Sequence, residues 1–232
     1  MSVLPRIILK KGKEKPLLRG HPWVFSGAVA KIEGEVSPGD IGEIYSKDGH
    51  FLGIGHLNPR SQIILRILTQ KKEELGKIFF RERISRAVIL RNQWLRGKTN
   101  AYRVINGEGD YLPGMIVDRY REILVLQCLT AGMERIRETF TEWLVKEFHP
   151  QSVYERSDVA TRSEEGLTES KGLLYGKDVP EFIEIEEYGC RFRVNVKKGQ
   201  KTGFYLDQRE NRFSLEDLSE GKKILDCFCY TG

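Results

Sequence analysis

The chain has 232 residues, of which 40% are hydrophobic and 31% are charged. This balance is typical of a globular protein, and no stretch approaches the roughly 20 apolar residues that a membrane helix requires. The N-terminal segment MSVLPR also lacks the apolar core of a signal peptide. We therefore expect a cytoplasmic protein that folds as one large domain or as two or three small ones.

Positive charge is unevenly distributed along the chain, although the net charge is only +5. Residues 60–103 contain 12 Lys and Arg against 3 acidic residues, whereas residues 104–190 contain 9 basic against 18 acidic residues. The first 25 residues are also basic. Concentrated positive charge suits a polyanionic partner, but a solvated basic helix explains it equally well.

The four cysteines, Cys128, Cys190, Cys227 and Cys229, do not have the spacing of a zinc site. They lie in apolar, strand-like contexts, which predicts reduced and buried thiols and no metal. Cys227 and Cys229 would share one face of a strand, so we expect them to pack there rather than to act in catalysis.

Residues 1–72 are predicted to form a small all-β barrel. Short strands are expected at 7–9, 41–45, 51–56 and 63–68, and the Lys47-Asp48-Gly49 turn indicates a hairpin. The segment 20–27 is predicted to be a rigid turn that leads into an aromatic anchor.

Residues 73–180 are predicted to form an α+β domain. Apolar residues at helical spacing predict a helix over 73–96, with Ile78, Phe79, Ile84 and Trp94 on its buried face. Strands are expected at 102–105, 115–118, 123–129 and 152–155. An amphipathic helix lies between the last two and ends at Pro150.

Residues 181–232 begin with an alternating hairpin, 182–186 and 191–196, around Tyr188-Gly189. A dense polar and aromatic stretch follows at 199–212, and then a polar helix to about residue 218. The apolar run at 224–229 ends in an acidic residue and a turn glycine, which is typical of the first strand and loop of a Rossmann-like sheet. We expect the rest of that sheet to lie beyond Gly232.

Four long segments, in order, carry a resemblance to a known family: GHPWVFSG at 20–27, NGEGDYLPGMIVDRY at 106–120, KTGFYLDQR at 201–209 and LDCFCYTG at 225–232. The chain resembles the PUA-domain methyltransferases that form 5-methylcytosine in large-subunit ribosomal RNA. The resemblance implies a mixed fold, with an N-terminal all-β PUA barrel, a central α+β domain and the start of a C-terminal α/β Rossmann-like domain.

The resemblance implies S-adenosylmethionine as the cofactor. Phe204 and Tyr205 can form apolar walls, Gln208 and Arg209 offer donors to the cofactor's carboxylate or to RNA phosphate, and Asp207 either contacts ligand or orients an arginine. Asp226 stands at the carboxyl end of the expected strand, facing the ligand or capping the loop. The cofactor-binding residues we predict are Phe204, Tyr205, Gln208, Arg209, Asp226, Phe228, Thr231 and Gly232.

Methylation at cytosine C5 requires a thiolate that attacks C6 and a base that removes the C5 proton. The resemblance places that cysteine beyond Gly232, so we predict no catalytic residue within the chain and no turnover by these 232 residues alone. Two alternatives remain: an RNA-binding fragment without catalysis, or methylation of a guanine nitrogen or of uracil C5.

The barrel is expected to dock RNA through its backbone, using Arg6, Lys10, Lys11, Lys13, Arg19 and His21. A solvated side chain is the alternative for each, and His21 could instead hold the turn beside Trp23. The implied partner is large-subunit ribosomal RNA, free or partly assembled. The resemblance also implies a homodimer, and no membrane partner is expected.

Overall fold

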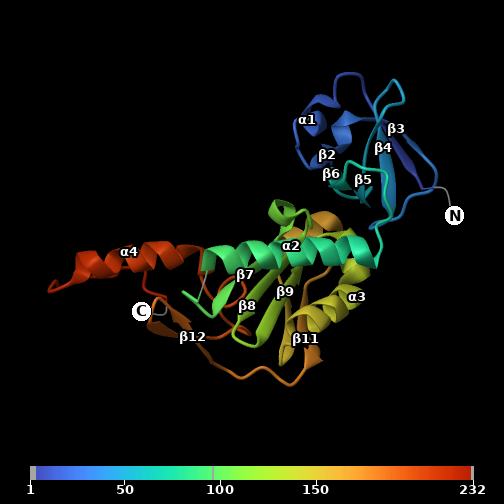
Figure 1. Ribbon diagram of the computed structural model, residues 1–232. Coiled ribbons are helices and arrows are strands. Elements are labelled where there is room, and N and C mark those ends of the chain that lie inside the picture. Colours follow the sequence, from blue (N-terminus) through green and yellow to red (C-terminus); the bar gives the residue numbers. More distant parts are fainter. Residues whose placement is uncertain (1–3, 96, 231–232) are drawn as a thin grey trace.

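The computed structural model describes residues 4–95 and 97–230. Its N-terminal part is a six-stranded sheet in the order β2-β6-β5-β4-β1-β3, in which β1 and β4 are parallel and the other pairs antiparallel (Figure 1). The strands are β1 (Arg6–Leu9), β2 (Trp23–Phe25), β3 (Val29–Glu33), β4 (Ile41–Tyr45), β5 (Phe51–Leu57) and β6 (Ile63–Thr69), and one helical turn, α1 (Lys15–Leu18), follows β1.

The N-terminal sheet encloses its own apolar core, to which Ile7, Val24, Ile44 and Leu65 contribute. The four strands predicted in this region are confirmed. Strands β2 and β3 were not predicted. Strand β2 has only three residues and lies in the segment 20–27, which we expected to be a turn. It becomes a strand by pairing with β6, a contact that local sequence does not reveal.

The central part is a five-stranded sheet in the order β11-β10-β9-β8-β7, with two long helices over one face (Figure 1). Its strands are β7 (Ala101–Asn106), β8 (Met115–Tyr120), β9 (Ile123–Cys128), β10 (Ser152–Ser157) and β11 (Ser170–Gly176); the helices are α2 (Lys77–Leu95) and α3 (Ala131–Phe148). Strands β9 and β10 are parallel and α3 connects them. The edge strand β11 was not predicted.

Helix α3 begins and ends where its sequence specifies. Thr130 caps its N-terminus by accepting a hydrogen bond from the Met133 N–H, and His149 ends it in the left-handed conformation, at φ 46°, just before Pro150. Helix α2 corrects part of our prediction. Phe79 and Ile84 are buried as expected, but Ile78 and Trp94 are 76% and 73% exposed and lie off the buried face.

A hairpin, β12 (Ile183–Glu187) and β13 (Cys190–Val194), leads to the final helix, α4 (Arg209–Ser219). The hairpin packs on the face of the central sheet opposite the two long helices, where Ile185 and Val194 join Tyr120 and Val125 in a second apolar cluster. The central sheet is therefore covered on both faces. The boundary we placed at residue 181 stays a prediction.

The strand predicted at 224–229 is wrong: Ile224–Asp226 form no regular element, and a turn follows. Leu225 and Phe228 are 85% and 95% exposed, because no strand in the described part of the chain lies beside this segment to cover it. The prediction of four buried thiols is also wrong, since Cys128 is buried but Cys190, Cys227 and Cys229 are exposed.

The N-terminal sheet is joined to the central part through the buried carboxylate of Glu165. Its Oε1 lies 2.7 Å from Arg66 Nη1, while its Oε2 accepts hydrogen bonds from Asn58 Nδ2 at 2.8 Å and from the Ala131 N–H at 3.3 Å. Burial opposes ionisation of Glu165, but the Asn58 hydrogen bond and the Arg66 charge lower its pKa overall. Among the residues that the structure describes, no helix is both long and apolar enough to cross a membrane.

His56 is buried at the same junction. Its ring lies against Gly132, where an added Cβ would come within 2.1 Å of the ring, and Nδ1 has no hydrogen-bond partner within the described residues. Burial, together with the nearby positive charges of Arg66 and Arg135, lowers the pKa of His56 to about 4.

We predict that this histidine makes the fold less stable in weak acid. Because its folded pKa lies below the unfolded value, its contribution is complete above about pH 6.5 and is lost as the pH falls toward 4. Linkage gives a loss of about 2 kcal/mol in the free energy of unfolding at pH 5 relative to pH 7.5.

Urea unfolding at the two pH values measures this change in the free energy of unfolding. His56→Gln should remove this component, and His50→Gln, at an exposed turn position, should retain it; equal pH dependence in all three proteins would contradict the prediction.

Candidate functional site

The predicted motif at 201–209 is attached to the central sheet by a buried carboxylate. Asp118, on β8, accepts a hydrogen bond from Thr202 Oγ1 at 2.5 Å and is bound by Arg103 through both carboxylate oxygens, at 2.8 and 3.1 Å. Tyr120 Oη lies 2.9 Å from the same threonine hydroxyl. Burial and the neighbouring Asp118 raise the pKa of Tyr120, which keeps its hydroxyl protonated. Thr202 is therefore an anchor rather than a ligand-binding residue.

Two arginines fix the backbone on either side of this anchor. Arg156, on β10, donates to the carbonyls of Val196 and Gly199 at 2.5 and 3.1 Å. Arg212, on α4, donates to the Tyr205 carbonyl at 2.9 Å and pairs with Glu187. Burial raises the pKa of Glu187 although Arg212 acts in the opposite direction. The conformation of the motif is thus set by side chains from three different elements.

The structure brings the motif next to the segment 226–230 through Tyr230. Its hydroxyl accepts a hydrogen bond from the Gln200 N–H at 2.9 Å and lies 3.3 Å from the Gly203 carbonyl. The rings of Tyr230 and Tyr205 meet edge to face, with centroids 5.6 Å apart, and the Tyr205 hydroxyl donates to Gln200. We did not select Tyr230 from the sequence, although it lies within the segment whose pattern we recognised.

The other motif residues predicted to bind the cofactor have mixed surroundings. Phe204 is buried in the apolar cluster under the hairpin, with Arg212 4.4 Å above its ring, so packing is its main contribution. Gln208 is exposed, and its Oε1 accepts a hydrogen bond from Asn211. Arg209 is mostly buried; its Nε lies 3.5 Å from Glu210 Oε1 without hydrogen-bond geometry.

One of our alternatives supposed that Asp207 pairs with an arginine, but in the described part of the chain its partner is Lys201. It lies 2.8 Å from Lys201 Nζ, and this hydrogen bond lowers its pKa. Asp226 is exposed and accepts a hydrogen bond from the Phe228 N–H at 2.9 Å, which corresponds to the loop-capping alternative. Phe228 points into solvent, and Thr231 and Gly232 lie outside the described residues.

A cavity of about 540 Å³ opens between the C-terminal half of α2 and the motif. Arg91, Arg103, Lys201 and Arg209 supply cations to its lining, and Asp207 supplies its carboxylate. The remaining lining residues are Leu90, Trp94, Leu95, Tyr102, Asn106, Phe204 and Leu206. Sequence reasoning missed the α2 and β7 residues in this set. For Trp94 the reason is that helical spacing placed its side chain on the buried face of α2.

The predicted RNA-binding side chains, Arg6, Lys10, Lys11, Lys13, Arg19 and His21, are all exposed, but they are not equivalent. Arg6 lies apart on β1, 3.7 Å from Glu43, and Lys10 donates to the Gly27 carbonyl. Lys13 and His21 line a hollow of about 510 Å³ together with Trp23 and Phe25. His21 Nδ1 accepts from the Trp23 N–H at 3.2 Å, so it also holds the turn.

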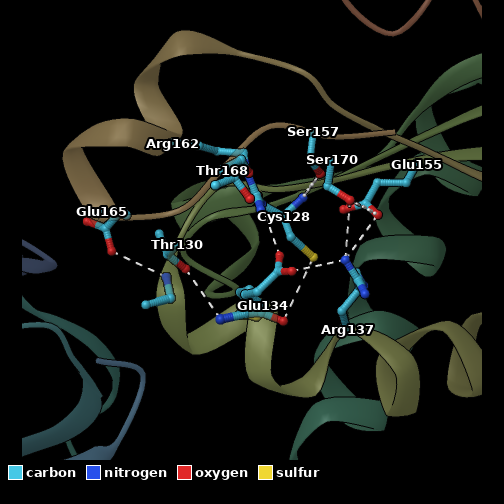
Figure 2. A network of polar contacts seen from close by, with 12 residues as sticks. Cys128, Thr130, Glu134, Arg137, Glu155, Ser157, Arg162, Glu165, Thr168 and Ser170 are labelled. Carbon is cyan, nitrogen blue, oxygen red and sulfur yellow. Dashed lines mark hydrogen bonds and ion pairs between the residues drawn. The ribbon is translucent and has the colours of Figure 1, made fainter. Parts of the chain in front are cut away.

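A second polar cluster lies under the loop between β10 and β11 (Figure 2). The ligand atoms of Cys128, Glu134 and Glu155 lie within 4.8 Å of one another, a spacing that could suit a metal ion. However, Arg162 and Arg137 lie 3.0 and 2.9 Å from the Glu134 carboxylate, and Arg137 also reaches Glu155 at 3.2 Å.

These arginines already neutralise the two carboxylates and would repel a cation. Burial raises the pKa of the Cys128 thiol well above its usual value, which disfavours the thiolate that a metal or a nucleophilic reaction needs. The cluster therefore fastens α3 to β10 and to the β10–β11 loop.

We predict that Thr202→Val destabilises the fold by about 1–3 kcal/mol, because it leaves Asp118 and Tyr120 each short of one buried hydrogen-bond partner. Urea denaturation measures the change. Thr168→Val makes the same threonine-to-valine exchange at an exposed position and should change stability by less than about 0.5 kcal/mol. Equal effects of the two substitutions would show that the Thr202 hydroxyl does not anchor the motif.

Comparison with known proteins adds three findings. Residues 7–70 match the model of the PUA-like domain family, so the N-terminal sheet is a PUA-like domain. Over 230 residues the chain is 46% identical to the "Ribosomal RNA large subunit methyltransferase I" of Shewanella frigidimarina and 44% identical to that of Yersinia pseudotuberculosis. In both cases the match covers 98% of this chain and 58% of the relative, so the chain spans little more than half of their length.

Solved structures agree at the level of the fold. A Streptococcus mutans protein assigned as a SAM-dependent methyltransferase superposes with a TM-score of 0.76 at 24% identity, over 92% of this chain and 54% of that one. A second structure, of an assigned methyltransferase in complex with SAH, gives the same TM-score and identity over 90% of this chain and 53% of that one. The PUA-like domain, the mixed α/β part and the motif at 201–209 thus occur here in a chain similar to ribosomal RNA methyltransferases.

Proposed function

We propose that the protein takes part in S-adenosylmethionine-dependent methylation of large-subunit ribosomal RNA. The observation that carries this proposal is the similarity over 230 residues to methyltransferases of that description. The structure supports it by combining a PUA-like domain with a rigidly anchored motif that lies against the segment 226–230. An RNA-binding role without catalysis is the alternative.

The cofactor-binding residues would lie on the Tyr205 side of the motif. The Tyr205 ring offers a partly buried aromatic wall and Tyr230 closes it from the other segment. The Gln208 amide is exposed, and its Nε2 could donate to a ligand while its Oε1 accepts from Asn211. Gly203, at φ 137°, lets the backbone pass close to Val196. Bound S-adenosylmethionine would supply an electrophilic methyl group, and these residues would orient it and exclude water.

The apolar side chains of the segment 224–228 are left exposed. Ile224, Leu225 and Phe228 are 67%, 85% and 95% exposed, so the described residues leave the proposed site open on that side. We propose that the protein acts in the cytoplasm and, from the family resemblance, that it forms a homodimer.

We propose C5 of cytosine as the methylated position, and a guanine nitrogen or uracil C5 as the alternatives. The burial and raised pKa of Cys128 make it unsuitable as the nucleophile that attack at C6 requires. Methylation of a guanine nitrogen needs no thiolate, so covalent trapping by 5-fluorocytosine in RNA, tested on a form of the enzyme that contains the nucleophilic cysteine, separates the two chemistries.

We predict that Tyr205→Ala and Asp226→Ala each weaken S-adenosylmethionine binding by about tenfold or more, because the first removes the aromatic wall and the second removes the carboxylate that caps the adjoining loop. Isothermal titration calorimetry of the protein with S-adenosylmethionine measures the affinity. Tyr175→Ala, on edge strand β11, is the matched control and should leave it unchanged. Equal affinity in all variants would contradict the proposed position of the cofactor.

RNA would dock on the hollow beside His21, Trp23 and Phe25. The three rings lie 5.8–6.4 Å apart, and Lys13 and Arg19 stand near them in the turns before and after α1. Aromatic faces next to cations suit nucleic acid, because bases can stack while phosphates are neutralised.

We predict that exchanging Lys11, Lys13 and Arg19 together for glutamine weakens RNA binding and reduces its salt dependence. Each lost phosphate contact should lower the slope of log Kd against log salt concentration by about 0.7–0.9. Fluorescence anisotropy with a ribosomal RNA hairpin at several salt concentrations measures it. Exchanging Lys146 and Lys177, which are exposed on the central part, is the control, and an equal change in slope there would contradict the prediction.

A further inference from the structure

We propose that the cavity between α2 and the motif receives an unpaired nucleotide of the RNA substrate. The inference rests on the proposed function and assigns a second role to the same motif: the Tyr205 side would hold the cofactor, and the opposite side would hold the nucleotide. The base would lie against Trp94, and the phosphate would be bound by Lys201 and Arg209.

The size and chemistry of the cavity fit such a ligand. Its volume of about 540 Å³ is within the usual range for small-molecule sites and suits one nucleotide. Cations outnumber carboxylates in its lining, and the aromatic rings of Trp94 and Tyr102 stand beside them. A ligand with a flat apolar part and a negative charge matches both features.

Packing of α2 on the sheet does not account for the position of Trp94 among the described residues. Helix α2 is fixed to the sheet by Phe80, Ile84 and Ala87, whereas the Trp94 side chain is left mostly in solvent at the mouth of the cavity. A tryptophan exposed to this degree loses the stabilisation that burial of its large ring would give. A ring held at the end of a rigid helix is, however, well suited to stack on a nucleobase.

The four cations of the lining differ in how strongly they are already engaged. Arg91 and Arg103 are paired through two hydrogen bonds each to the buried carboxylates Asp110 and Asp118, so they are structural. Lys201 pairs with the exposed Asp207, an interaction that solvent weakens. Arg209 has a buried Nε without a hydrogen-bond acceptor among the described residues, and its ion pair with the exposed Glu210 is long, at 3.5 Å. Lys201 and Arg209 are thus the cations available to a phosphate.

The turn between β7 and β8 connects this cavity with the RNA-docking hollow of the PUA-like domain. In the helical turn η2 (Gly107–Asp110), Glu108 accepts a hydrogen bond from Trp23 Nε1 at 2.8 Å, and Asp110 binds Arg91. Asn106, the preceding residue, lines the cavity. RNA bound beside Trp23 would therefore be held at a fixed distance from the cavity, so that one strand could reach both.

The experiment measures binding of a fluorescein-labelled 12-nucleotide single-stranded RNA, and of a duplex of the same length, by fluorescence anisotropy. Trp94→Ala should weaken binding of the single strand about tenfold, because it removes one stacking partner, and should change duplex binding less than twofold. Ile78→Ala is the matched control, as it removes an equally exposed apolar side chain from the same helix outside the cavity. Lys201→Gln should lower the salt slope for the single strand by about 0.7.

Titration of S-adenosylmethionine into the same variants separates this inference from the proposed function. Trp94→Ala should leave cofactor affinity within twofold of the wild type. Weaker cofactor binding with unchanged RNA binding would assign the cavity to the cofactor and overturn the inference. Unchanged single-strand affinity in Trp94→Ala would also overturn it. Absence of any cofactor binding in the wild type would count against the proposed function, while the RNA measurements would still decide the role of the cavity.

Discussion

The candidate site depends on one buried carboxylate, that of Asp118. It lies on the sheet face opposite α2 and α3, where an unpaired charge would be strongly destabilising, and it is stabilised by the bidentate bond to Arg103 and by the Thr202 hydroxyl. Burial by itself would lower the pKa of Arg103, but its bond to Asp118 raises it. Because one of the partners belongs to the motif, the interaction that satisfies the charge also places residues 201–209 on the sheet.

The same principle joins the PUA-like domain to the rest of the chain. Glu165 is buried at the junction, and its partners come from β6, from the loop after β5 and from the start of α3. Glu165 itself lies in the loop between β10 and β11. Arg162, in the same loop, fastens it to the central sheet by binding Glu134 and the Cys128 carbonyl (Figure 2). Buried charges that need partners on both sides of an interface fix its geometry more narrowly than apolar contacts do. The RNA-docking surface and the motif therefore belong to one connected framework.

Most of the regular structure could be predicted from the sequence, because apolar periodicity and chain breakers are local signals. The helix that ends at Pro150 and the hairpin around Gly189 are examples. The signals failed where a distant partner decides the outcome. Strand β2 exists because β6 pairs with it, and the apolar run at 224–228 stays irregular because nothing described pairs with it. Within the site, the motif was recognisable, but periodicity could not show that Trp94 points away from the core.

The motif has two sides, and this has a thermodynamic consequence. Tyr205 faces Tyr230, whereas Leu206 and Asp207, the next two residues, line the cavity under α2. A ligand that immobilises this short stretch from either side lowers the conformational entropy that a second ligand must remove from it. Cofactor and nucleotide would then strengthen each other's binding by the same factor, since coupling free energies are reciprocal. Ordered, mutually dependent loading of two substrates needs no moving domain when a single peptide segment separates them.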